Sequence, residues 1–481
     1  ICACLVGSEM CIRDRTYSVV DNKTGVKFSK SAEITVRSPY LVGWLILSEK
    51  DGKSALSFIK MRTVKRDDID AEGNPVERDS IIFYDVEKYF RPDLGTEPKG
   101  LMEHIGVEYD FGFSDAVYDE IVVMQGKDNW VELNGNTMEH EVYTKEEFGN
   151  DLPENFEPVE AAMTFSSKLI RDKNGFIYLH RKVLANDYHA GSYISVPLAN
   201  STKFKGLYQA HKLYNRNYYV IPACTEDNSL VGIWDAGRYN EYSLDGTPSA
   251  ITENSSRNDG NIVELTENTD EKHFKQMSKN VIAMIPATCG RDNRFDVTDS
   301  YIVPKWLALM EEKGTYSMRY FGLEGDTSGG IVTVTDFKEV PVDARVFAAG
   351  YVDMAVFQHK KYVVFASGKE IWYYPYGGST SNAVLLKKFD QNIVSISSHD
   401  VEEYTRDGDI YHNGHLGVAL ENGDFFIYEV VEEDKVLDNI TVNQLYPSPE
   451  TEDKDNNNFG KIVDTLYKFG NASGVFTYTF Q

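Results

Sequence analysis

Histidines and carboxylates come together in one stretch of the chain, SSHDVEEYTRDGDIYHNGH (397–415). His412 and His415 are three residues apart, and Asp409 lies three residues before the first of them. Two imidazoles and a carboxylate could bind a divalent metal ion. On a β-strand, however, this odd spacing turns the two rings to opposite faces. We therefore favour ordinary polar loop histidines, with a metal site as the alternative.

A second stretch, DIDAEGNPVERD (68–79), approximates a calcium-binding loop. Asp68, Asp70 and Glu72 supply oxygens at alternate positions, and Gly73 is sixth. The pattern departs from a calcium loop at its fifth position, which is Glu, and at its twelfth, which is Asp. Such matches are common in acidic chains, so a solvated acidic hairpin loop is the favoured interpretation. Calcium remains the alternative, and no other cofactor is predicted.

Clustered aromatic residues are the candidates for ligand binding. IWYYPYGG (371–378) contains Trp372, Tyr374 and Tyr376, and NDYHAGSY (186–193) contains Tyr188 and Tyr193. Exposed aromatic rings can stack on the apolar faces of sugars. The buried strands of an all-β core have the same composition, so core packing is the favoured interpretation of the first group. No catalytic residue is predicted, because the chain contains no G-x-S-x-G, H-E-x-x-H, Walker or Rossmann motif.

Charge and composition narrow the classes of partner. The net charge of −26 repels phosphate backbones, which makes nucleic acid an unsuitable partner. The longest apolar runs, such as LVGWLIL (41–47), are too short to cross a bilayer. With 42% hydrophobic residues, the chain can bury a substantial core.

The first fifteen residues do not belong to the fold. Leu5–Asp14 back-translates into a transposase adapter used to build sequencing libraries, so we expect residues 1–15 to be adapter-derived sequence on a truncated gene. Such segments are excluded from fold reasoning. Two cysteines then remain, Cys224 and Cys289, which could form one disulfide or stay as two thiols.

The rest of the chain repeats one layout, a strand, a tight polar turn and an aromatic-rich strand. The copies lie at 119–135, 167–183, 217–235, 361–378 and 415–431. Their turns carry the Gly, Asn and Asp residues that hairpins require. A strand–turn–strand unit that recurs every 40–50 residues is typical of a β-propeller blade. We predict an all-β chain with a β-propeller over 40–481, with seven blades, six or eight being possible. A pair of β-sandwiches is the alternative.

Few segments suggest helices, and one segment stands apart from the repeats. The best helical candidates are 303–312 (VPKWLALMEE) and 270–280 (DEKHFKQMSKN). Residues 16–39 predict a lone hairpin before the boundary at Pro39. A lone hairpin is marginally stable in water, so we interpret it as the end of a truncated Ig-like domain.

The junction between this hairpin and the propeller resembles PKD-like family lipoproteins of Gram-negative gut bacteria. That family has a "D-x-x-T-G-V" hairpin, then "T-V-x-[ST]-P-[FY]", then "G-W-[LM]-[LV]-L-x-E". The matching residues here are Asp21, Thr24, Gly25, Val26, Thr35, Val36, Ser38, Pro39, Tyr40, Gly43, Trp44, Leu45, Ile46, Leu47 and Glu49. Beyond this junction the resemblance is only architectural.

The resemblance implies a PKD (Ig-like) domain followed by a propeller-like region. It also implies a lipid-anchored protein of the outer membrane or cell surface, accessory to a Sus-type uptake system. Such a protein would be non-catalytic and would bind a glycan, a peptide or outer-membrane transporter components. It would contact the membrane only through a lipid anchor that the fragment lacks. A propeller-fold glycoside hydrolase or lyase and a structural subunit of an uptake complex are the alternatives.

Overall fold

A computed structural model describes the chain, and almost all of its secondary structure is β-strand. The described residues are 11–36, 39–40, 42–69, 73–108, 116–163, 167–181, 189, 191–199, 202–209, 219–235, 260–287, 305–325, 330–357, 362–376, 382–404, 410–432, 440–449 and 457–468. Within these ranges the helical elements are two 3-10 turns, η1 (Thr144–Phe148) and η3 (Ala344–Phe347). The all-β prediction is confirmed.

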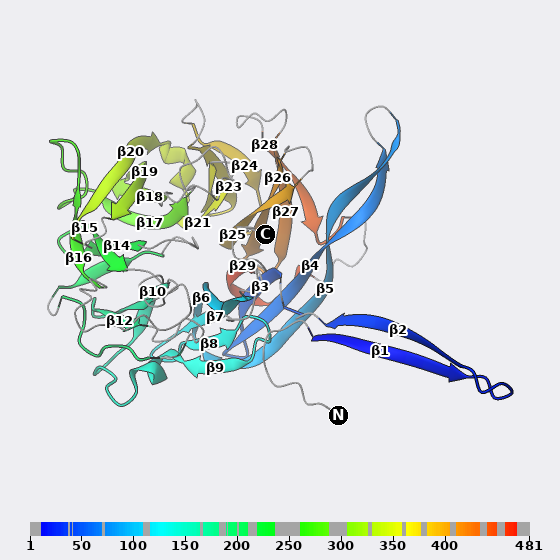
Figure 1. Ribbon diagram of the computed structural model, residues 1–481. Coiled ribbons are helices and arrows are strands. Elements are labelled where there is room, and N and C mark those ends of the chain that lie inside the picture. The colour runs from blue at the N-terminus through cyan, green and yellow to red at the C-terminus, as the bar shows by residue number, and fades with distance from the viewer. Residues whose placement is uncertain are drawn as a thin grey trace.

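Antiparallel sheets stand around a common centre and form a closed ring, as Figure 1 shows. The sheet that closes the ring contains β29 (Lys461–Lys468), β3 (Gly43–Lys50), β4 (Lys53–Ile69) and β5 (Pro75–Thr96). The next two sheets contain β6 (Pro98–Glu108), β7 (Ala116–Gln125), β8 (Val131–Asn134) and β9 (His140–Tyr143), then β10 (Pro158–Met163), β11 (Ser167–Asp172) and β12 (Ile177–Arg181). The ring identifies a β-propeller, as predicted.

The remaining strands complete the ring. A continuous sheet contains β13 (Phe204–Leu207), β14 (Tyr219–Thr225), β15 (Leu230–Asp235), β16 (Ile262–Thr266), β20 (Val332–Val342), β19 (Thr315–Gly325), β18 (Lys305–Glu312) and β17 (Asn280–Ala287). Two sheets follow, with β21 (Tyr351–Phe357), β22 (Tyr362–Ser367), β23 (Glu370–Pro375) and β24 (Val384–Lys388), then β25 (Ile393–Tyr404), β26 (Ile410–Leu420), β27 (Phe425–Glu432) and β28 (Ile440–Tyr446).

The eight-stranded sheet is two meanders joined at their outer edges. Its strands pair antiparallel except β16 and β20, which run parallel where Leu265 faces Val332 and Thr266 faces Thr333. Dividing the sheet at this parallel pair gives seven meanders among the described residues. The number of blades itself stays a prediction.

Strands from the two ends of the chain close the ring. β29 pairs antiparallel with β3, from Lys461 opposite Glu49 to Lys468 opposite Gly43. The closing sheet therefore takes its innermost strand from the C-terminal part and its other three strands from the N-terminal part. Closure by pairing leaves no exposed sheet edge between the first and last blades.

The innermost strand of every meander carries a β-bulge at the same place. The strands that lie closest to the centre are β29, β6, β10, β13, β17, β21 and β25 (Figure 1). In each, the register to the next strand shifts by one residue near the start, just before Asp464, Gly100, Glu160, Gly206, Ala283, Asp353 and Ser395. The bulge therefore recurs in every described meander, although the residue that follows it differs in type from one strand to another.

Three of these positions hold a carboxylate that links one sheet to the next. Glu160 accepts a hydrogen bond from the backbone N–H of Leu207 at 2.7 Å. Asp353 and Asp464 accept in the same way from Ile396 and Leu101, each at 2.8 Å. We call these three residues the bulge carboxylates. Each faces a sheet whose own residue at the bulge is small, Gly206, Ser395 or Gly100, which leaves room for the carboxyl group.

Apolar side chains fill the interfaces between neighbouring sheets. Tyr362 and Tyr373, for example, share a buried cluster with Leu416 and Val418 of the following sheet. Because both faces of a blade are covered, its strands are apolar on both faces. No helix in the described part of the chain is long and apolar enough to cross a membrane.

Both predicted helices are wrong. Residues 303–312 include β18, and the first six residues of that strand are buried. Burial on both faces removes the polar alternation that separates a strand from a helix in sequence. The second candidate, 270–280, consists of bends up to residue 279, after which β17 begins.

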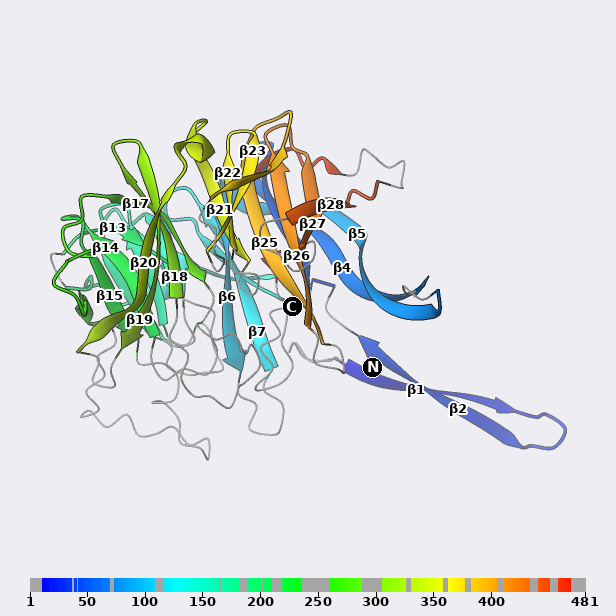
Figure 2. The ribbon, with the colours of Figure 1, turned by 90° about the horizontal axis from the view of Figure 1, so that it is seen from above.

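Two hairpins extend from the ring. β1 (Cys11–Val20) and β2 (Lys27–Val36) pair only with each other, and Figure 2 shows them projecting away from the propeller. β1 begins within the segment expected to be adapter-derived, and the predicted domain boundaries stay predictions. The second hairpin is the outer part of β4 and β5, which are far longer than the strands beside them and extend past the closing sheet (Figure 1).

Candidate functional site

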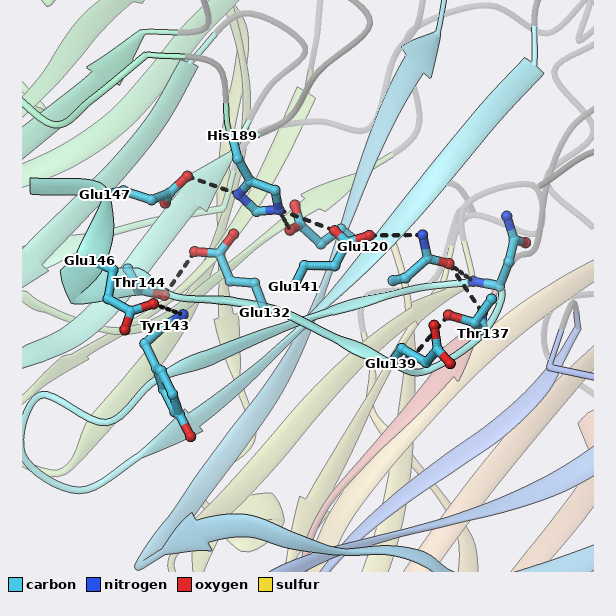
Figure 3. Close-up of polar contacts among 12 residues, drawn as sticks. Glu120, Glu132, Thr137, Glu139, Glu141, Tyr143, Thr144, Glu146, Glu147 and His189 are labelled. Atoms are coloured by element: carbon cyan, nitrogen blue, oxygen red, sulfur yellow. Dashed lines mark hydrogen bonds and ion pairs between the residues drawn. The ribbon is translucent and has the colours of Figure 1, made fainter. Parts of the chain in front are cut away.

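Ionisable side chains, most of them buried, gather between the β6–β9 sheet and the β10–β12 sheet, and Figure 3 shows part of the group. We call this group the Glu–Lys–His cluster. Its members are Glu120 on β7, Glu132 on β8, Glu141 on β9, Glu147 on η1, Lys168 on β11, His180 on β12, and His189 and Tyr193 in the segment after β12. Burying charge costs free energy unless opposite charges compensate, so this cluster needs a specific explanation.

Lys168 is the fully buried centre of the cluster. Its Nζ lies 2.6 Å from Glu132 Oε2, 2.9 Å from Glu147 Oε1 and 4.0 Å from Glu120 Oε2. Burial by itself lowers the pKa of a lysine, but the three carboxylates outweigh it and raise the pKa of Lys168 above its ordinary value. The side chain is therefore a permanent ammonium ion that orders the carboxylates around it.

The carboxylates around Lys168 differ in protonation. Burial, and then the charge of Glu147, raise the pKa of Glu132 to about 8. Burial also acts to raise the pKa of Glu147, but Lys168 and the hydrogen bond from His189 lower it overall. Glu132 Oε1 accepts a hydrogen bond from Thr144 Oγ1 at 2.7 Å. Lys168 and His189 carry two positive charges among four carboxyl groups, so protonation is favoured at the fully buried Glu132.

His189 connects the buried interior to solvent. Its Nδ1 lies 2.9 Å from Glu147 Oε1, and its Nε2 lies 2.8 Å from Glu120 Oε1 and 3.1 Å from Glu141 Oε2 (Figure 3). Burial would lower the pKa of His189, but hydrogen bonds to the three carboxylates raise it to about 12. The side chains of His189 and Glu141 are 23% and 29% exposed, so this edge of the cluster is open to small ions.

Tyr193 packs against the residues of the cluster. Its ring stacks on Phe148, with centroids 4.6 Å apart, and meets His180 edge-on at 5.0 Å. Its backbone N–H donates to the carbonyl of Glu147 at 2.9 Å. The phenol oxygen is buried and has no hydrogen-bond partner among the described residues. Burial, and then the charge of Glu147, hold the pKa of Tyr193 well above its usual range.

The sequence missed this cluster, although it contained a partial signal. NDYHAGSY was singled out for Tyr188 and Tyr193, and not for His189 between them. Tyr188 lies outside the described residues. Tyr193 is only 3% exposed, so its ring cannot serve as a platform for a sugar. Acidic residues inside otherwise apolar strands, as in DEIVVMQ and WVELN, were the available signal.

The first aromatic group lies in the core. Tyr374 is 1% exposed, and it packs in one cluster with the half-buried Trp372 and Tyr376. Tyr376 stacks on Tyr320, with centroids 5.5 Å apart. These contacts connect the β21–β24 sheet to the β17–β20 strands. They give Tyr374 a packing role, and a ligand-binding role for Trp372 and Tyr376 stays a prediction.

Most of the predicted metal candidates lie outside the described residues. His415 lies on β26 and is 1% exposed, and burial lowers its pKa to about 4. The side chain of His412 and the whole of Asp409 lie outside the described residues. The backbone of Asp68 belongs to β4, and Asp70 and Glu72 lie outside the described residues. Both metal sites stay predictions.

Two carboxyl groups on innermost strands could suggest a glycosidase pair, but their oxygens are already used. Asp353 accepts hydrogen bonds from the backbone N–H groups of Met354 and Ile396, and Asp464 accepts from Leu101, Thr465 and the hydroxyl of Ser395. Burial raises the pKa of Asp353 to about 7 and also raises that of Asp464. These hydrogen bonds connect backbone segments and occupy the oxygens of both carboxyl groups.

Cys224 is a buried free thiol, and burial raises its pKa to about 11. Cys289 lies outside the described residues, so the question of pairing stays open.

No protein-family model matches the chain, and no curated protein matches it in sequence. The solved structures similar to it are β-propeller-like proteins. They include the periplasmic gluconolactonase PpgL of Pseudomonas aeruginosa, which is 8% identical with a TM-score of 0.40 over 84% of this chain and 95% of that one. BBS1N in complex with ARL6DN is 12% identical with a TM-score of 0.37 over 70% of this chain and 80% of that one. A mutant of AofleA from Arthrobotrys oligospora is 10% identical with a TM-score of 0.32 over 73% and 90%. Likeness at this level gives no guide to activity or ligand.

Proposed function

We propose that the propeller is a non-catalytic binding module of a lipid-anchored cell-surface protein accessory to a Sus-type outer-membrane uptake system. Its ligand is a glycan, a peptide or a component of the outer-membrane transporter. The surface location and the uptake system follow from the resemblance of residues 17–49 to the junction of PKD-like lipoproteins. The binding role follows from how the ring presents its connections.

The observation that carries the proposal is the face at which two long connections begin. Residues 236–261 join β15 to β16, and residues 288–304 join β17 to β18. Because strands alternate in direction within a meander, the first and third strands end at the same face of the ring. Both long connections therefore belong to one face. In rigid scaffolds, long loops that leave one face are the usual place for recognition.

Each connection that begins and ends at the opposite face is shorter than these two. There the second and third strands are joined by short turns, such as Gly126–Trp130, Lys173–Phe176 and Gly368–Lys369. Tight turns contain few residues, so they offer few side chains to a ligand. A partner that recognises this propeller should therefore contact the face with the long connections.

Binding by purified full-length chain is the test. The protein is immobilised and offered plant and host glycans, peptide pools and detergent-solubilised outer-membrane proteins from a Gram-negative gut bacterium. Deleting residues 240–256 should abolish the binding that the parent shows. The matched control is a Gly-Ser replacement of Lys127 and Asp128 in a turn of the opposite face, which should bind like the parent. Failure to bind any of the three classes, or equal loss in both variants, would reject the proposal.

A further inference from the structure

The outer edge of the Glu–Lys–His cluster has the donor set of a metal centre. Oxygens of Glu120 and Glu141 and a nitrogen of His189 lie within 4.8 Å of one another. Figure 3 shows the three side chains converging from β7, β9 and the segment after β12. They come from separate stretches of the chain, so only the packed fold brings them together. We propose that Glu120, Glu141 and His189 bind a divalent transition-metal ion.

The second nitrogen of His189 is held as a metal ligand requires. A metal-binding histidine almost always donates its other N–H to a carboxylate or carbonyl, which fixes the tautomer and the ring orientation. Here Nε2 faces Glu120 and Glu141, and Nδ1 lies 2.9 Å from Glu147 Oε1. Glu147 is itself held by Lys168 at 2.9 Å. The buried half of the cluster therefore acts as a support that aims Nε2 at the two carboxylates.

Lys168 decides which of two possible trios takes the ion. Glu132, Glu147 and His189 also converge within 4.8 Å. The ammonium ion of Lys168 already lies 2.6 Å from Glu132 and 2.9 Å from Glu147, so a second cation there would be repelled. Its distance to Glu120 is 4.0 Å, and the outer trio is the one that solvent reaches. An ion therefore binds at the outer trio.

Two buried polar atoms leave the cluster incompletely hydrogen-bonded. Among the described residues, Tyr193 Oη and Glu147 Oε2 have no hydrogen-bond partner, although both are buried. A buried polar group without a partner costs free energy. The protein groups of the cluster therefore do not satisfy one another completely, as is typical of a site that holds a further ligand.

The mixed donor set selects the class of metal. Calcium and magnesium prefer sites made entirely of oxygen. Imidazole suits zinc, iron, nickel and copper, and carboxylates also suit manganese. Two carboxylates and one imidazole therefore favour an ion of the manganese-to-zinc series. Because the imidazole must lose a proton to bind, affinity should rise with pH and each ion should displace about one proton from His189.

The test uses the full chain, stripped with a chelator and then titrated with Zn²⁺ or Mn²⁺. Calorimetry in two buffers of different ionisation enthalpy measures affinity, stoichiometry and protons released. We expect one ion per chain, with an affinity that falls at least about 100-fold in His189→Gln and Glu141→Gln. The matched control is His140→Gln, an exposed histidine next to Glu141, which should bind like the parent.

Three outcomes would overturn the inference: no ion bound, several ions per chain, or equal affinity in Glu141→Gln and the control. Glu141 lies at the solvent edge of the short strand β9, so its amide variant keeps the test decisive if His189→Gln fails to fold. The Mn²⁺ form gives a separate readout, because coupling to a nitrogen nucleus in its paramagnetic resonance spectrum should vanish in His189→Gln. The inference does not depend on the proposed binding role, since metal titration and ligand capture are measured separately.

Discussion

His415 is a buried histidine whose environment favours the neutral ring. It is 1% exposed, contacts Phe83 with centroids 6.2 Å apart, and its Nδ1 has no hydrogen-bond partner among the described residues. Burial lowers its pKa from 6.5 to about 4. Between these two values the unfolded chain binds more protons at this site than the folded chain. Stability should therefore fall as the pH is lowered from about 6.5 to 4.

Replacing His415 with Phe should remove this acid sensitivity. A shift of this size corresponds to about 3 kcal/mol, at about 1.4 kcal/mol for each pH unit. The parent should lose up to that much unfolding free energy between pH 6.5 and 4, and His415→Phe should lose distinctly less. Urea denaturation across this pH range measures the difference.

The exposed His140 supplies the control for this measurement. His140→Phe should follow the pH profile of the parent. If His415→Phe keeps the same acid slope as the parent, other groups cause the loss and the assignment to His415 is wrong.

The sequence could predict single residues of the candidate site only where they were neighbours along the chain. Tyr193 was named as a ligand-binding candidate, whereas His189 in the same stretch was not. Glu120, Glu132 and Lys168 belong to three different strands, and an apolar residue directly follows each of them. Their charges compensate one another only after two sheets pack together. Contacts between residues that are far apart in the sequence leave no pattern in the spacing of neighbouring residues.

At the scale of the element, the bulge carboxylates connect neighbouring sheets near the centre of the ring. Asp464 is the most heavily used, because it accepts hydrogen bonds from two backbone N–H groups and from Ser395 Oγ. A bulge re-aims the side chain that follows it, which allows an acidic residue on one sheet to reach the backbone of the next.

Asp464→Ala should therefore destabilise the fold. The substitution leaves the N–H of Leu101 without its acceptor, and such a loss costs about 1–3 kcal/mol. With the contact to Ser395 also lost, we expect about 2–3 kcal/mol in the free energy of unfolding. Chemical denaturation measures the effect, and Asp390→Ala, at an exposed position before β25, is the control. Equal stability of the two variants would show that the bulge carboxylates do not bind the sheets together.

The elements themselves were predicted well where turns were polar and strands alternated. The hairpins predicted within 119–135, 167–183, 217–235, 361–378 and 415–431 all lie where the sequence placed them. The failures were the two helices. WLALM (306–310) in β18 is apolar at every position and buried throughout, so periodicity alone could not separate strand from helix. The segment forms a strand because neighbouring sheets cover both of its faces.

At the scale of the molecule, the ring depends on the pairing of β29 with β3, whereas the β1–β2 hairpin pairs only with itself. The two ends of the chain should therefore respond differently to deletion. Removing residues 457–481 withdraws the innermost strand of the closing sheet, and it exposes buried side chains such as Trp44, which contacts Tyr467 at 5.2 Å. We expect this variant to lose its cooperative thermal transition.

Removing residues 1–36 is the matched control. It takes away the β1–β2 hairpin and leaves every pairing of the ring intact, so the melting temperature should change by no more than about 2 °C. Differential scanning calorimetry compares the two deletions. A cooperative transition without β29, or a large loss without the hairpin, would contradict the closed-ring description.

Ring closure also has a consequence for biosynthesis. β3 is made before the other meanders of the ring, but its inner partner β29 is made after them. Until β29 emerges, one edge of β3 therefore has unpaired N–H and C=O groups and an apolar surface, which invite association with other nascent chains. A cell that produces this protein must shield that edge while the meanders between β3 and β29 are made. Slower elongation should then lower the yield of soluble product, and a chaperone that binds extended strands should restore it.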